Sequence, residues 1–183
     1  MTYWLDLFSG TTWDEFQAAG SAVSGFRPTI TKMARNVKPG DILLCYMTGV
    51  QRWVGALEVL GPSDDTTPIW KGDEFPVRLA VKPLIELDAE HGVPMKALEG
   101  RVSFYQGSKD VGGFNGFIRQ SLRPFKTEQE GCLIFDLLRK AHAAPVARPV
   151  DPKKLQRKPY YTAQTKKGKH TVPVQVTIPE PEP

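Results

Sequence analysis

The stretch Lys38-Pro39-Gly40-Asp41-Ile42-Leu43-Leu44-Cys45-Tyr46 decides the fold of this 183-residue chain. Its Pro-Gly-Asp turn leads into an apolar run, and a second apolar run follows after a short loop, from Trp53 to Leu60. A turn and two apolar runs in this order predict a buried β-hairpin. Aromatic side chains stand at the ends of both runs, which favours a small barrel with an aromatic pocket at its mouth.

Outward from the hairpin, the sequence predicts further strands and several short helices. Aromatic and aliphatic residues predict a strand over 3–8, and alternating apolar and charged residues predict another over 74–84. Thr12, with Glu15 three residues later, predicts a capped helix that Gly20 ends. Strands mixed with short helices and no βαβ repeat predict an α+β fold, a small pseudo-barrel of mixed strands flanked by short helices. The other expected elements are helices at 29–36, 93–98 and 127–140 and a loop at 112–117.

Composition is that of a soluble globular protein. Hydrophobic residues make up 40% and charged residues 24% of the chain, and 183 residues fit one domain with a tail. Cys45 and Cys132 each lie in an apolar run, which predicts buried free thiols rather than a disulfide or a zinc site. The chain opens without a secretory pattern and has no apolar run long enough to span a membrane. We therefore expect a cytoplasmic protein without membrane contact.

The positive charge is concentrated toward the C-terminus. The chain has 24 basic and 20 acidic residues, and residues 145–183 hold eight of the basic and three of the acidic ones. The first 144 residues therefore carry 16 basic against 17 acidic residues, a net charge of −1. A Pro-rich, basic composition predicts a tail or linker over 143–183, with room for a short hairpin, after a domain over 1–142. A local excess of five basic residues over one acidic residue, from Arg101 to Lys126, favours a phosphate-facing surface.

Motifs of catalysis and metal binding are absent from the sequence. No two of the three histidines have metal-ligand spacing, and there is no Cys-x-x-Cys pair. Neither a phosphate-binding glycine loop followed by lysine nor a Gly-x-Ser-x-Gly or Ser-x-x-Lys nucleophile motif occurs. The acidic residues at 64, 65, 73 and 74 lack a following acidic-x-Lys triplet, which favours a solvated loop over a nuclease site. We expect a protein that is not an enzyme and uses no metal or cofactor.

Several motifs follow one another in a distinctive order. A strand and a Ser-containing loop precede Trp13-Asp14-Glu15-Phe16, then Phe26-Arg27-Pro28-Thr29, then the hairpin. Further on, Ile69-Trp70 precedes Phe75-Pro76-Val77-Arg78, and Gly92-Val93-Pro94-Met95 precedes Val102-Ser103-Phe104-Tyr105. This order, over residues 3–140, resembles the EVE domain of the PUA-like superfamily. EVE domains are similar in fold to YTH domains, which hold methylated adenine of RNA in an aromatic cage. Prokaryotic EVE-like modules are linked to modified bases in DNA, often beside a restriction nuclease.

The resemblance implies a base-binding pocket. Phe26 and Trp70 lie where such domains carry two cage aromatics, and Phe8 with Ser9 correspond to the loop that reads the base edge. Phe26 departs from the tryptophan that is usual in YTH pockets, and phenylalanine stacks more weakly. The implied pocket residues are Phe8, Ser9, Phe26, Thr29, Tyr46, Trp53 and Trp70.

Basic residues near this pocket and around the glycine-rich segment are candidates for contacts with the nucleic-acid backbone. Phe114 or Phe117 could wedge into the gap left by a flipped base, while neighbouring cations bind phosphates. The predicted backbone-binding residues are Arg27, Lys109, Arg119 and Arg123.

Three functions remain open at the level of sequence. The favoured one is a DNA-binding module that flips a modified base, a methylated or hydroxymethylated cytosine or a methylated adenine, into the aromatic cage. Such a module would be the recognition part of a restriction or defence system, and the tail would tether an effector nuclease domain or subunit. The second is an RNA-binding module that reads modified tRNA or rRNA nucleotides. The third is a protein-interaction module whose pocket takes a modified lysine or no ligand.

Overall fold

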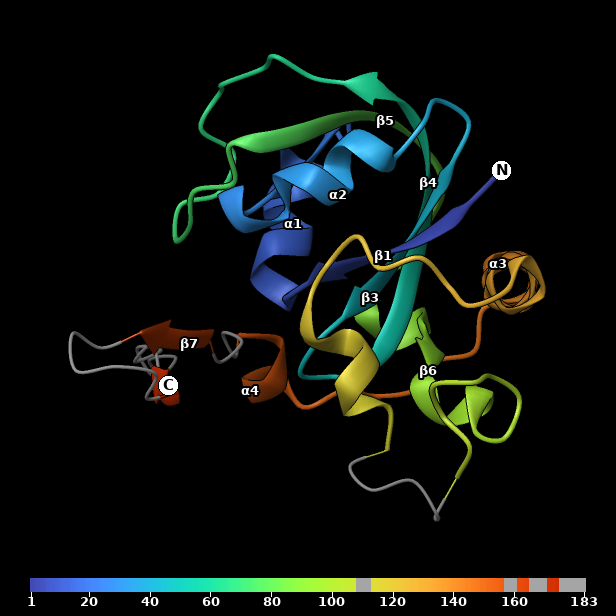
Figure 1. Cartoon of the computed structure of the whole chain (residues 1–183). Coiled ribbons are helices and arrows are strands. Elements are labelled where there is room, and N and C mark those ends of the chain that lie inside the picture. Colours follow the sequence, from blue (N-terminus) through green and yellow to red (C-terminus); the bar gives the residue numbers. More distant parts are fainter. Residues whose placement is uncertain (108–112, 157–160, 165–170, 175–183) are drawn as a thin grey trace.

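The computed structural model describes residues 1–107, 113–156, 161–164 and 171–174 of the chain (Figure 1). Short helices alternate with strands throughout the first 100 residues, and the longest helix follows near residue 130. In chain order the elements are β1 (Tyr3–Phe8), α1 (Gly10–Ala18), β2 (Val23–Phe26), η1 (Pro28–Ile30), α2 (Thr31–Asn36), β3 (Ile42–Met47), β4 (Arg52–Pro62), β5 (Val77–Glu86), η2 (Ala89–His91), β6 (Val93–Pro94), η3 (Met95–Leu98), η4 (Gly113–Arg119), α3 (Glu128–Ala143), α4 (Pro152–Leu155), β7 (Tyr161–Gln164) and β8 (Thr171–Val174).

One curled sheet of mixed strands organises the fold. The strand order is β1-β3-β4-β5-β2, with β6 paired to β4, and a separate antiparallel pair joins β7 to β8. β1 and β3 run parallel, whereas the other neighbours in the large sheet run antiparallel. In Figure 1 the long β4 and β5 curve around α1 and α2, and α3 lies beyond β4 on the other side. The expected α+β pseudo-barrel flanked by short helices is confirmed.

The hairpin that the sequence predicted is formed by β3 and β4, which pair from Ile42 opposite Glu58 to Met47 opposite Arg52. Asp41 fixes the turn that begins it. Its carboxylate accepts hydrogen bonds from the Lys38 amide (2.9 Å), the Thr2 amide (2.9 Å) and the Trp4 indole (3.0 Å). Burial of this carboxyl opposes ionisation, but the hydrogen bonds outweigh it and hold the pKa of Asp41 below its ordinary value.

Helix α1 begins earlier than the sequence predicted. Ser9 is its N-cap: the Ser9 hydroxyl accepts from the Thr12 amide (3.1 Å), and the Thr12 hydroxyl accepts from the Ser9 amide (2.8 Å). The expected cap at Thr12 with Glu15 is therefore wrong. Thr12 instead stands three residues after the cap residue Ser9, and its hydroxyl accepts the reciprocal hydrogen bond that a glutamate accepts in the usual capping box. The Glu15 carboxylate instead accepts from the Lys71 amide (2.8 Å), far along the chain.

Other elements depart from the predictions in smaller ways. The expected loop over 112–117 is wrong in its described part, where Gly113–Arg119 forms the 3-10 helix η4. Strand β2 was not predicted, because its four residues Val23–Phe26 include a serine and a glycine and carry too weak a β signal. The predicted strands at 3–8 and 74–84 and the helices at 29–36 and 127–140 are confirmed within a few residues.

The sheet separates two hydrophobic cores. The α1-side core contains Trp13 and Phe16 of α1 and the strand residues Leu43 and Leu57, and the α3-side core contains Ile134 and Leu138 of α3 among others. Successive strand side chains point alternately to the two faces of the sheet, so neighbouring buried residues of a strand pack into different cores. In the described part of the chain, no helix is both long enough and apolar enough to span a membrane.

The cysteines differ in their surroundings. Cys45 is fully buried, and burial raises the pKa of its thiol well above the ordinary value. Cys132 is only half-buried on α3, and its sulfur lies 3.4 Å from the Tyr3 hydroxyl. Both are free thiols, as the sequence predicted, but the predicted burial is confirmed for Cys45 alone.

Residues 145–156, which we call the strap, pack back on the body. The Arg148 amide donates to the Glu90 carbonyl (2.9 Å), and Val150 and Leu155 pack against the α1-side core. A Cβ at Gly10, the first residue of α1, would collide with the Leu155 carbonyl, so the strap can lie this close only because residue 10 is glycine. The folded body therefore runs past the expected boundary at residue 142, as far as α4.

Candidate functional site

Two of the expected pocket aromatics are core residues next to α1. Phe8, at the end of β1, lies with its ring centre 4.9 Å from that of Trp13 and 5.4 Å from that of Phe16. Phe26, at the end of β2, is 2% exposed and belongs to the same α1-side core. Both rings are therefore part of the packing of the α1-side core.

Tyr46 and Trp53 lie on the other face of the sheet. Both are fully buried in the α3-side core, with ring centres 5.0 Å apart. The expectation that they share a cavity with Phe8 and Phe26 is therefore wrong. Neither the Tyr46 hydroxyl nor the Trp53 indole nitrogen has a hydrogen-bond partner among the described residues. Burial raises the pKa of Tyr46 above its ordinary value.

A β-bulge explains the position of Trp53. Cys45 pairs with Gly55 but Tyr46 pairs with Trp53, so Val54 is an extra residue in β4. Val54 lies in the α1-side core and Trp53 in the α3-side core. Regular alternation from Leu57, which is in the α1-side core, would have placed Trp53 on the same side as Phe8. The extra residue turns it to the opposite face.

Trp70 lies in the long loop between β4 and β5 and reaches back to α1. Its indole N–H donates to the Thr12 carbonyl (3.3 Å), and the side chain is 7% exposed. The Phe75 ring meets it edge to face with centres 5.2 Å apart, and the Arg78 guanidinium lies 5.4 Å from its ring centre. These contacts fix the indole at the rim of the barrel.

Gly25 provides the surface on which this indole rests. A Cβ at Gly25 would come within 2.5 Å of the Trp70 ring, so the ring lies where other residues of a strand carry a side chain. Consecutive strand residues point to opposite faces, and the neighbouring Phe26 points into the α1-side core. Trp70 and Phe26 therefore lie on opposite faces of β2 and do not face one another across an open cage in this structure.

The polar candidates at this rim have different surroundings. Ser9 is 6% exposed, and its hydroxyl is engaged in capping α1. Thr29 is exposed in η1. Arg27 pairs with Asp73 (3.4 Å) and lies with its guanidinium 5.5 Å from the Phe75 ring centre. The structure thus brings several predicted residues together with others that sequence did not single out. The group joined by these contacts, which we call the Trp70 rim, consists of Thr12, Gly25, Arg27, Trp70, Phe75 and Arg78.

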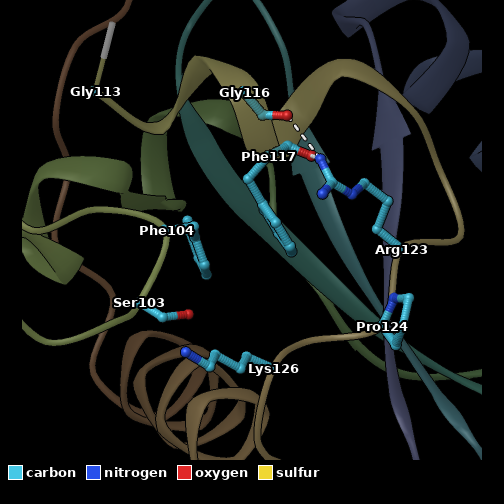
Figure 2. A pocket seen from close by; sticks show the side chains of 8 residues that line it. All are labelled: Ser103, Phe104, Gly113, Gly116, Phe117, Arg123, Pro124 and Lys126. Atoms are coloured by element: carbon cyan, nitrogen blue, oxygen red, sulfur yellow. Dashed lines mark hydrogen bonds between the residues drawn. The ribbon is translucent and has the colours of Figure 1, made fainter. Parts of the chain in front are cut away.

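The other expected backbone-binding residues lie elsewhere. Arg119 is exposed at the end of η4, and Lys109 lies outside the described residues. Arg123 donates to the carbonyls of Gly116 (2.6 Å) and Phe117 (3.2 Å), and its guanidinium lies 5.1 Å from the Phe117 ring centre. Arg123 and Phe117 line an open cleft on the α3 side of the sheet (Figure 2). Sequence named both residues as neighbours around the glycine-rich segment but did not predict the cleft or its Phe104 wall.

The described residues contain no group of three or more histidine, cysteine, aspartate or glutamate side chains placed to hold a metal ion. The chemistry available at the Trp70 rim is instead that of aromatic faces and guanidinium groups. Such groups bind flat or anionic ligands by stacking and charge.

No protein-family model matches this chain, and no curated protein matches its sequence. Solved structures share its fold. The Mmi1 YTH domain in complex with RNA is 14% identical, with a TM-score of 0.56 over 81% of this chain and 84% of that one. The Pho92 YTH domain in complex with m6A is 11% identical, with a TM-score of 0.55 over 82% and 90%. Protein Atu2648 from Agrobacterium tumefaciens is 21% identical, with a TM-score of 0.51 over 82% and 100%. The chain therefore has a YTH-like fold, whereas the resemblance to the EVE domain in particular stays a prediction.

Proposed function

We propose that this chain is a non-catalytic reader of a modified nucleotide, with a methylated base in single-stranded RNA as the first candidate. Its fold is that of YTH domains solved with RNA and with m6A. The observation that carries the proposal is the position of Trp70, an indole held by one side-chain hydrogen bond over a bare glycine at the barrel rim.

In this proposal the modified base stacks on the Trp70 ring. Stacking of a base on an aromatic side chain contributes about 1–3 kcal/mol. A methyl group adds about 0.8 kcal/mol when it is buried. A base must leave its own stack to reach the ring, and this costs least in a single strand. Discrimination between methylated and unmethylated bases would therefore be modest unless the rim also rejects the unmethylated amine.

The base would enter when the loop that carries Trp70 moves. Residues 63–76 form this loop. The polar contacts that tie it to the body lie near the surface and each contributes little to stability, but opening also exposes the buried Trp70 ring. Lifting Trp70 uncovers the bare backbone at Gly25, so a base can lie between this strand surface and the indole, while Phe26 stays in the α1-side core on the opposite face of β2. The tying contacts are Trp70 to Thr12, Lys71 to Glu15, Arg27 to Asp73 and Arg78 to Asp65.

Polar groups at and next to the Trp70 rim would hold the rest of the nucleotide. Arg27 has a side chain 41% exposed, so its guanidinium can reach a phosphate when the loop opens. Thr29 offers an exposed hydroxyl two residues further on. The Ser9 hydroxyl is already bonded within α1, so reading of the base edge falls to Thr29 and to backbone groups of the rim.

Fluorescence anisotropy at fixed salt tests the proposal. The full chain is titrated with single-stranded RNAs that carry adenine or m6A at one position, and with duplex DNAs that carry cytosine, methylcytosine or hydroxymethylcytosine. We expect tighter binding of the m6A RNA than of its unmodified match, and loss of that preference in Trp70→Ala. Phe135→Leu, which changes a half-buried ring on α3, is the control.

The same titration decides between nucleic acids. A preference for a modified DNA alone would replace RNA by DNA as the ligand and support the restriction-system reading, including an effector nuclease. Equal binding of all modified and unmodified strands by the native chain would overturn the reader proposal.

A further inference from the structure

The cleft on the α3 side is separate from the Trp70 rim and has its own chemistry. Its volume is about 500 Å³, within the range of small-molecule sites. Figure 2 shows that its lining comes from three segments, 103–104, 113–117 and 123–126, which meet beside β1. The eight lining residues are Ser103, Phe104, Gly113, Gly116, Phe117, Arg123, Pro124 and Lys126.

Two stacked rings form one wall of the cleft. Phe104 and Phe117 lie with ring centres 4.1 Å apart and planes 12° from parallel, and both are half-buried. Phe125 packs behind them, 6.0 Å from Phe104 and 5.2 Å from Phe117, and it also contacts Trp53 of the core at 6.1 Å. The ring pair is therefore held from behind, and because the two rings cover one another it turns ring edges toward the cleft. A wall held in this way binds a base with little loss of side-chain entropy.

Two cations stand beside this wall. Arg123 is fixed by its bonds to the Gly116 and Phe117 carbonyls, so its guanidinium stays over the Phe117 ring. Lys126 is exposed and makes no hydrogen bond or ion pair with any residue in the described ranges. The Glu130 carboxylate lies close by, but it accepts from the amide (2.6 Å) and hydroxyl (3.1 Å) of Ser103. None of the eight lining residues is acidic.

We propose that this cleft binds a second, unpaired nucleotide of the same strand. Its base packs against the ring edges that Phe104 and Phe117 turn toward the cleft, and its phosphate contacts Lys126 and the outer edge of Arg123. A free phosphate ion would leave the ring pair unused, and an apolar peptide would leave two cations without partners. A nucleotide uses both. The cleft reads no modification, because aromatic and phosphate contacts are available to any base.

This proposal rests on the proposed function only in taking a single-stranded nucleic acid as ligand. The full chain is titrated with the m6A RNA and its unmodified match, using native protein, Lys126→Glu and Phe117→Leu. Lys82→Glu, at an exposed position on β5, is the matched charge control. In parallel, 4-thiouridine is placed at each position of the RNA in turn, and crosslinked peptides are identified by mass spectrometry.

We expect Lys126→Glu and Phe117→Leu each to lower the affinity for both RNAs by about tenfold. The ratio of the two affinities, m6A RNA to unmodified RNA, should stay unchanged. Lys82→Glu should change binding less than twofold. Crosslinks to the peptide that carries Phe117 should arise from one register, at a fixed spacing from the modified nucleotide.

The outcomes separate this proposal from the reader function. If Lys126→Glu and Phe117→Leu bind like Lys82→Glu, and no crosslink falls on the Phe117 peptide, the cleft proposal is overturned while any preference for m6A still supports the reader. If the native chain shows no preference but both cleft variants bind tenfold more weakly, the cleft stands and the reader proposal falls.

Discussion

The Ser24 hydroxyl donates a 2.6 Å hydrogen bond to the Asp6 carboxylate, and this bond joins β1 and β2, the two strands at opposite ends of the sheet order. Both side chains are buried, at 0% and 1% exposure. The bond thus closes the curled sheet into a barrel through side chains where no backbone ladder between β1 and β2 is formed in the described residues. Burial raises the pKa of Asp6 to about 7, although the bond from Ser24 lowers it.

Asp6 should make the stability of the fold fall as pH rises from about 4 to about 7. In this window the folded chain holds a proton on Asp6 that the unfolded chain has lost, which favours folding at the acid end. The slope from this one group is about 1.4 kcal/mol per pH unit. We expect Asp6→Asn to flatten the profile and to be more stable than the native chain at pH 8. Urea unfolding at pH 5, 6, 7 and 8 measures this.

Burial raises the pKa of the Cys45 thiol, and the charges of Asp6 and Glu86 raise it further, so Glu86 shares a neighbour with Asp6. Glu86→Gln is therefore measured alongside. If Asp6→Asn and the native chain lose stability equally between pH 5 and 8, Asp6 does not titrate in that range.

The contribution of Asp41 to stability depends on pH in the opposite direction to that of Asp6. Its pKa lies below the ordinary value, so its contribution is present above about pH 4 and is lost as pH falls through the folded-state pKa. We expect Asp41→Asn to lower the free energy of unfolding at pH 7 by about 2 kcal/mol, since hydrogen bonds to a charged acceptor are lost. The difference should shrink at pH 3. Asp136→Asn, an exposed carboxylate on α3, should have little effect at either pH.

Gly25→Ala should displace Trp70 from the rim. The added methyl group would lie about 2.5 Å from the indole, too close for both to stay. The other tryptophans are buried at 5% exposure or less, so a rise in acrylamide quenching reports on Trp70. We expect increased quenching and loss of any preference for m6A, with the fold intact. Gly116→Ala, where a Cβ meets no atom within 4 Å, should leave quenching unchanged.

Removal of the strap should destabilise the body. A chain ended after Ala144 loses the packing of Val150 and Leu155 and the bond from Arg148 to Glu90. Two partly buried apolar side chains are worth about 2 kcal/mol together, which corresponds to a fall of several degrees in Tm. A chain ended after Gln156 keeps these contacts and should melt like the full chain. Equal melting of the two truncated chains would show that the strap contributes nothing to stability.

Sequence predicted the parts of this fold that depend on local pattern. The β3–β4 hairpin follows from a turn and two apolar runs, and α3 follows from its apolar spacing. It did not predict which aromatic faces which core, because a single bulge residue decides this for Trp53. It also missed the strap, because a Pro-rich basic segment has the composition of a linker whether or not its few apolar residues find a surface.

In the candidate site, too, sequence could identify a residue but not the contacts that position it. Trp70 could be named from the order of motifs, but its partners Thr12 and Gly25 lie 58 and 45 positions earlier in the chain, and only folding brings them together. The cleft of Phe104 and Phe117 likewise depends on Phe125 supporting both rings from behind.

The bulge at Val54 has an evolutionary consequence. Because one extra residue decides the face on which Trp53 lies, deletion of a single codon would move an indole from one side of the sheet to the other without changing any side chain. A lineage could in this way transfer an aromatic ring between the barrel interior and the layer beneath the Phe104–Phe117 cleft in one mutational step. The number of residues in β4 thus decides which face of the sheet carries an aromatic ring, just as the identity of those residues does.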